Sequence, residues 1–130
     1  EAFKSTDEGV AFLVKAEGKV IYHAGDLNWW HWEGEPASWN RNMETGFRRE
    51  IDSIAGERFD AAFVPLDPRL EAAYGLGMDY FLQKTSATHV FPMHMWEEYG
   101  YISKYKETQT GRQHAAQIVD ISRRGEEFML

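Results

Sequence analysis

The run Val20–Leu27 constrains the fold most, because it is an apolar β-type segment that ends abruptly at Gly25 and Asp26. Val, Ile and Tyr are enriched in strands, and a glycine at the end of a strand lets the chain turn sharply. An aspartate directly after a buried strand stands on a rigid platform, where it can act as a metal ligand or a catalytic base. Asp26 can equally cap the next turn or helix, so this stretch alone leaves both interpretations open.

The segments around this run predict one α/β domain over residues 1–130 with a mixed sheet and flanking helices. Apolar runs at 10–15 and 19–23 are joined by Glu17-Gly18-Lys19, which is typical of a β-hairpin. Further along the chain the pattern predicts helices at 40–57 and 68–85, buried strands at 59–66 and 88–91, a surface helix or loop at 97–106, and a terminal hairpin from 117–121 and 126–130.

Residues 27–40 combine tryptophans with Gly34 and Pro36, a composition that predicts a loop with an aromatic wall. The tryptophans in this loop are Trp29, Trp30, Trp32 and Trp39. Such rings either close over the core of a small domain or form the rim of a substrate pocket. We expect Trp29, Trp30 and Trp32 to lie at a rim that contacts a small-molecule substrate, because they follow Asp26 closely.

Composition excludes several classes of function. The net charge of −7 argues against a general nucleic-acid binder, which needs a basic face. No apolar run has the length of a membrane helix and no signal peptide is visible, so we expect a cytoplasmic protein that does not insert into membranes. The chain contains no cysteine, so a metal site would use histidine and carboxylate side chains.

Two predicted strands each end in a residue that can bind metal. Asp26 follows the strand at 19–23, and His94 follows the strand at 88–91. Side chains at neighbouring strand ends of an α/β sheet converge on one edge, where ligand sites form. Histidine together with aspartate suits zinc, manganese or iron, so the pair is a candidate metal site.

These residues carry a resemblance to a known family. His23-Ala24-Gly25-Asp26 and Pro92-Met93-His94 resemble the fourth and fifth motifs of the metallo-β-lactamase-fold hydrolases. Phe63-Val64-Pro65-Leu66 fits the lactonase-like branch that includes the L-ascorbate-6-phosphate lactonases. The resemblance implies the C-terminal half of a four-layer αββα fold. It also implies that Asp26 bridges two metal ions, zinc or another divalent metal, and that His94 binds the second.

The chain departs from the family at its other metal motifs. The pattern His-x-His-x-Asp-His is absent, and the resemblance places it before Glu1. The third-motif histidine is also missing, and Asp7 in its usual neighbourhood is a possible substitute ligand. His23 lies three residues from Asp26 and points away from it on a regular strand, so we interpret it as a supporting or core residue.

The resemblance implies a parent hydrolase in which a metal-activated water attacks an ester, lactone or phosphoester. With Asp26 and His94 as its own ligands, the chain alone is expected to be inactive. The alternative hypothesis is a non-catalytic binding or assembly module that keeps the scaffold without the chemistry.

The apolar runs also predict self-association. Ala11-Phe12-Leu13-Val14 does not alternate apolar and polar residues, as a strand with one solvated face should. A sheet built from such strands exposes an apolar face, and we expect a homodimer that covers it.

Overall fold

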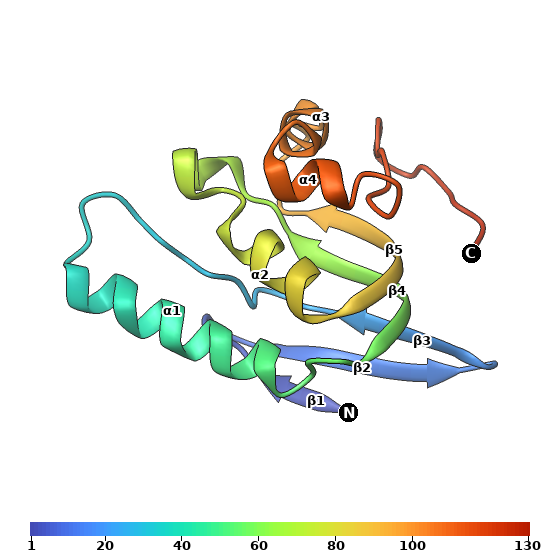
Figure 1. Cartoon of the computed structure of the whole chain (residues 1–130), viewed down its shortest axis with the longest axis horizontal. Helices are drawn as coiled ribbons and strands as arrows, with labels where there is room; N and C mark the ends of the chain where they lie inside the picture. Colours follow the sequence, from blue (N-terminus) through green and yellow to red (C-terminus); the bar gives the residue numbers. More distant parts are fainter.

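The structure, a computed structural model, describes residues 1–130 and contains one five-stranded mixed sheet with helices on one of its faces (Figure 1). The strand order follows the sequence. The first three strands pair antiparallel, and the last three pair parallel. The strands are β1 (Ala2–Lys4), β2 (Val10–Ala16), β3 (Lys19–His23), β4 (Arg58–Pro65) and β5 (Ser86–Met93).

The predicted hairpin is confirmed as β2 and β3, with Val14 opposite Ile21. Glu17 and Gly18 both have positive φ angles, 52° and 76°. Two successive residues of this kind form the type I′ turn, whose twist matches that of the flanking strands. The tight turn fixes the register of β3 and therefore the position of Asp26 beyond its end.

Helix α1 (Ala37–Asp52) confirms the first predicted helix, although it begins earlier and ends earlier than 40–57. Its apolar positions Phe47 and Ile51 are buried, and Ile54 is buried just beyond its end. The spacing of these residues places them on one face of the helix, which packs toward the sheet. The loop before α1 carries Trp29, Trp30 and Trp32, as predicted, whereas Trp39, which was also expected in the loop, lies in the first turn of α1.

The prediction of one helix over 68–85 is wrong. The segment is divided into a 3₁₀ helix, η1 (Pro68–Ala73), and a separate helix, α2 (Leu76–Lys84). Asp67 caps η1 by accepting a hydrogen bond from the Arg69 amide at 2.9 Å, and Glu71 then leaves the helical region with φ 54°. The break lets α2 turn back over the sheet, where Met78, Phe81 and Leu82 are buried.

The predicted terminal hairpin is also wrong. After α3 (Gly100–Lys106) and α4 (Gln109–Gln113), the chain pairs with β5 instead of with itself. The Val90 amide donates to the Gln117 carbonyl at 2.8 Å, and the Val119 amide donates to the Val90 carbonyl at 2.9 Å. The last residues have no regular secondary structure.

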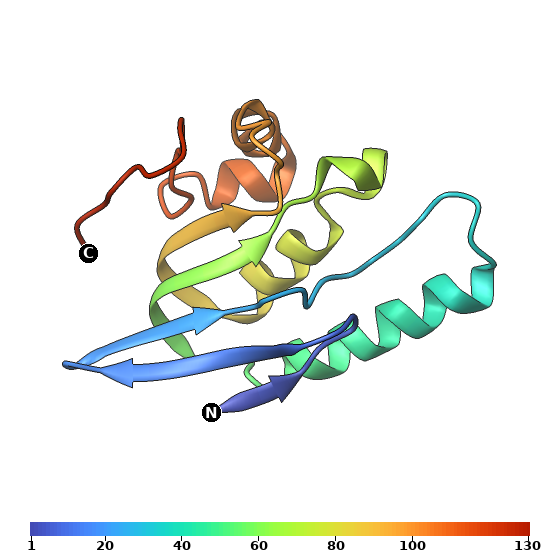
Figure 2. The same ribbon diagram turned by 180° about the vertical axis from the view of Figure 1, so that it is seen from behind.

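The core lies between the sheet and α1 and α2, while the other face of the sheet has no helix over it (Figure 2). Tyr22 faces the core and is 1% exposed, stacked on Phe59 and Phe81. Ile21 is apolar as well, but it lies on the opposite face because strand side chains alternate. No helix has both the length and the apolar character that a membrane span requires.

Candidate functional site

The carboxyl ends of the parallel strands β3, β4 and β5 meet at one edge of the sheet, and each strand is followed by an ionisable residue. Asp26 follows β3, Asp67 follows β4 and His94 follows β5. The structure brings Asp26 and His94 together, with 3.0 Å between His94 Nε2 and Asp26 Oδ1. The Asp26 side chain is 48% exposed, so this pair can be reached from solvent.

Asp67 completes the cluster, and the sequence interpretation treated it only as a helix cap. Its side chain is fully buried, and its Oδ2 lies 3.8 Å from His94 Nδ1. The Arg69 guanidinium holds the carboxylate from the other side, with Arg69 Nη2 2.7 Å from Oδ2 and Nε 3.1 Å from Oδ1. Asp67 follows a buried strand just as Asp26 does, and that position was the available signal.

His94 occupies an unusual backbone conformation. Its φ angle is 65°, and Trp96 and Glu97 in the same turn also have positive φ angles. Residues other than glycine seldom adopt such angles, and they persist where the surrounding structure holds them. The turn sets the imidazole between the two carboxylates, so that one ring nitrogen faces Asp67 and the other faces Asp26.

The negative charge of the buried Asp67 is compensated by the positive charge of Arg69. Its hydrogen bonds with Arg69 raise the pKa of the guanidinium, so the buried carboxylate always has a cation beside it. His23 is different, because partial burial and the neighbouring His94 lower its pKa. A neutral His23 accepts a hydrogen bond from the Gly25 amide at 3.0 Å and stacks on Phe63, so it supports the turn before Asp26.

Two of the predicted rim tryptophans lie at the site. Trp30 is buried and donates from Nε1 to the Asp26 carbonyl at 2.9 Å, and its ring meets the His94 ring edge-on at 5.9 Å. Trp32 stacks parallel to Trp30, and the Arg69 guanidinium lies over the Trp32 ring at 5.5 Å. Together they form an aromatic wall beside the polar cluster.

Trp29 does not belong to this wall, which corrects its expected place at the rim. It packs against Phe47 of α1 and Tyr80 of α2, with Arg48 over its ring. Adjacent residues of an extended segment point in opposite directions, so Trp29 and Trp30 are separated. Sequence proximity to Asp26 could not distinguish them.

The donor atoms present are of a kind that binds metal ions, but they are too few for a complete metal site. Asp26 offers a carboxylate oxygen and His94 an imidazole nitrogen, the donors that zinc and manganese accept. No three side chains of the histidine, cysteine or acidic type are grouped so that they could hold a metal. Asp7 instead lines a hollow of about 180 Å³ with the aromatic wall, Trp39, Met43 and Arg69.

The cluster can still bind a cation, because His94 has one nitrogen directed to the open side and one directed to a buried carboxylate. A carboxylate behind a histidine ligand is a common feature of protein metal sites. Comparisons with protein-family models, curated proteins and solved structures find no match to this chain. A functional proposal for this chain therefore rests on the chemistry of the cluster.

Proposed function

We propose that this chain supplies half of the active site of a metal-dependent hydrolase that acts on an ester, lactone or phosphoester. Asp26 and His94 are the metal ligands of this half, and further ligands come from another polypeptide segment. The observation that supports the proposal is the position of His94 between the exposed Asp26 and the buried Asp67. This arrangement has the carboxylate–histidine order of protein metal sites, in which the second carboxylate orients the ligand.

Each remaining residue has a role in this proposal. Asp67 lies 3.8 Å behind His94 and favours this orientation of the ring by charge, and Arg69 compensates the buried charge of Asp67. Trp30 and Trp32 form the wall against which a small substrate would lie. A divalent metal, when bound, acidifies water and polarises the bond to be hydrolysed. The exposed side of Asp26 is where metal and substrate would approach.

The isolated chain should bind Mn²⁺ or Zn²⁺ only weakly, because a closed zinc site takes four ligands. Paramagnetic broadening of amide signals by Mn²⁺ locates even a weak site. We expect broadening around Asp26 and His94, and its loss in Asp26→Ala and in His94→Ala. Asp67→Asn, which removes the charge behind His94, should weaken the binding about tenfold to a hundredfold.

His114→Ala is the matched control, since His114 lies at the end of α4 and contacts Gln117 instead of the cluster. It should leave the broadening unchanged. Broadening that is absent, or that survives Asp26→Ala, contradicts the proposal. Submicromolar, stoichiometric zinc binding by calorimetry would show that the chain holds more ligands than the two named here.

A second candidate is a non-catalytic assembly module. The observation that favours it is the exposed apolar side chains on the sheet face that the helices leave bare, such as Phe12 at 46%. An assembly module needs no metal site, so Mn²⁺ would then cause no broadening around Asp26 and His94 that depends on these two side chains. The Mn²⁺ experiment therefore separates the two functions.

A further inference from the structure

The sheet face opposite α1 and α2 is apolar across several strands, and we call it the open face. In β2 its exposed side chains are Val10, Phe12 and Val14, which are 40%, 46% and 48% exposed. The register continues this surface onto the neighbouring strands, because cross-strand partners share a face. The open face comprises Val10, Phe12, Val14, Ile21, His23, Ala61, Phe63 and Phe91, and the same register places Lys4 beside Val10 and His89 beside Ala61.

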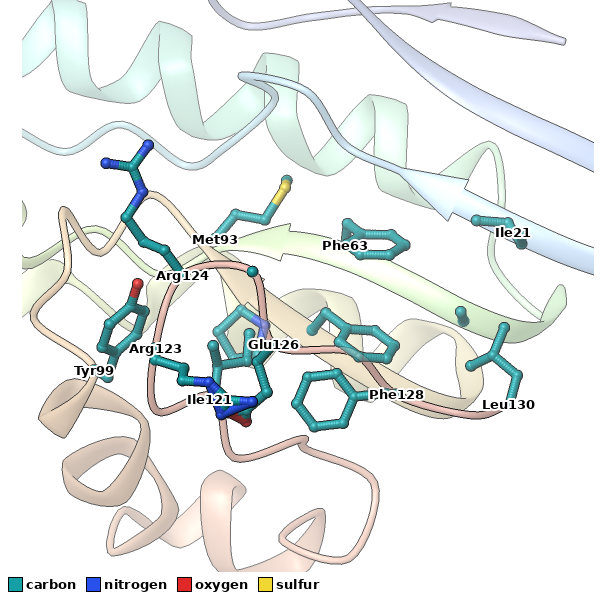
Figure 3. Close-up of a pocket in the computed structure, with 14 residues that line it drawn as sticks. Ile21, Phe63, Met93, Tyr99, Ile121, Arg123, Arg124, Glu126, Phe128 and Leu130 are labelled. Carbon is teal, nitrogen blue, oxygen red and sulfur yellow. The ribbon is translucent and has the colours of Figure 1, made fainter.

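The C-terminal residues 120–130, which we call the tail, cover only one side of the open face (Figure 3). Phe128 contacts Phe91 with ring centroids 5.5 Å apart. A cavity of about 480 Å³ remains between the tail and the sheet. Ile21, Ala61 and Phe63 line it on the sheet side. The exposed side chains of β2 lie beyond the residues that line this cavity.

The tail is held weakly. None of its residues takes part in a hydrogen bond between two backbone groups, and the last such bond to β5 is that of Val119. Its ion pairs with the rest of the chain are Arg124 with Glu97 at 3.3 Å and Lys106 with Asp120 at 2.9 Å, and each pair includes a mostly exposed partner. Exposed ion pairs contribute little to stability. Phe128 is still 40% exposed, and Ile121 is the tail residue that packs against the core, so the residues after Ile121 are the part that can move.

A stable protein–protein interface takes ~800 Å² from each partner. Val10, Phe12 and Val14 are each less than half exposed, so a partner needs more of the open face than these three side chains. Displacement of the tail uncovers Phe63, Phe91 and Ile21, which line the cavity beneath it.

We propose that two copies of this chain pack with their open faces together and that the tail moves aside to let them meet. A flat row of apolar side chains at two-residue spacing matches another sheet with the same spacing, as in a β-sandwich. A second copy offers such a face, and a two-fold arrangement buries both faces at once. The interaction does not depend on the metal site.

Sedimentation of the full chain from low to high micromolar concentration tests the proposal. The wild-type chain should form dimers, and Phe12→Asp should weaken dimerisation at least about a hundredfold, because the charge enters the interface twice. Phe128→Ser loosens the tail from Phe91 and should tighten dimerisation about threefold to tenfold. Asn42→Asp adds the same charge on α1 and should leave the dimer unchanged, as should Asp26→Ala.

Several results would overturn the proposal. These are a wild-type chain that stays monomeric throughout the range, a dimer that survives Phe12→Asp, and a dimer weakened by Phe128→Ser. Circular dichroism and thermal melting establish whether Phe12→Asp is folded. If it is not, Phe12→Ala provides the second variant, with an expected weakening of about tenfold, and a dimer unaffected by it also overturns the proposal.

Discussion

Gly25 links the hairpin to the polar cluster at the level of a single residue. Its φ angle is +59°, and a Cβ atom added there would lie 2.6 Å from the Val10 carbonyl oxygen. The backbone at the start of β2 therefore approaches the turn that carries Asp26 as closely as a glycine permits. A side chain at this position requires the backbone to shift, and that shift would move Asp26.

We predict that Gly25→Ala lowers the free energy of unfolding by about 2–4 kcal/mol, from φ strain and from the clash with Val10. Gly34→Ala is the matched control, because Gly34 has φ +87° but no atom within 4 Å of its added Cβ. It should cost about 1 kcal/mol. Urea denaturation measures both, and equal losses would mean that the close approach to Val10 contributes nothing.

The polar cluster was predictable from the sequence only in part. Asp26 and His94 are recognisable because each follows an apolar run that ends at a sheet edge. Asp67 has the same position after β4, but its capping of η1 gave it a sufficient local explanation. Arg69 was missed because its contact with Asp67 depends on the turn of η1, which local propensity does not specify.

At the level of secondary structure, strand side chains point alternately to the two faces of the sheet. In β3 this alternation places two neighbouring apolar residues in different environments. Tyr22 lies against Phe59 and Phe81 in the core, whereas Ile21 lies over the open face beside the tail. The two residues therefore differ in how much packing they lose on truncation. Both are β-formers, so composition alone could not assign their faces.

We predict that Tyr22→Ala costs about 3–5 kcal/mol of unfolding free energy, as for other buried aromatic residues. At chain concentrations too low for dimers, Ile21→Ala should cost about 1 kcal/mol, because Ile21 is only partly buried in the single chain. Denaturant midpoints of the two variants, with equal slopes, provide the comparison. A larger loss for Ile21→Ala at these concentrations would mean that the tail covers Ile21 tightly.

The elements that were predicted correctly have a pattern contained within their own residues. The hairpin has its turn, and α1 has its apolar face at Phe47 and Ile51. The errors concern segments shaped by distant partners. Residues 117–119 pair with β5 because Val90 offers a free edge, and α2 separates from η1 because it packs back on the sheet. The local sequence does not determine which distant segment a strand or helix will contact.

Considered as a whole, the molecule combines a well-filled core on one side of its sheet with an apolar surface on the other. It also carries a net charge of −7. Repulsion between two such chains opposes dimerisation, whereas burial of the open face favours it. The balance between these effects depends on salt, because screening weakens the repulsion but leaves apolar burial intact.

We therefore predict that the proposed dimer becomes several-fold tighter as ionic strength rises from about 0.02 M to about 0.2 M. Sedimentation equilibrium in sodium chloride measures the change, and Phe12→Asp should remain monomeric at both salt concentrations. An interface built on ion pairs would respond in the opposite direction, because salt weakens attraction between exposed charges. A dimer that dissociates as salt is added would thus be held by contacts between exposed charged residues. The open face would then not be its interface.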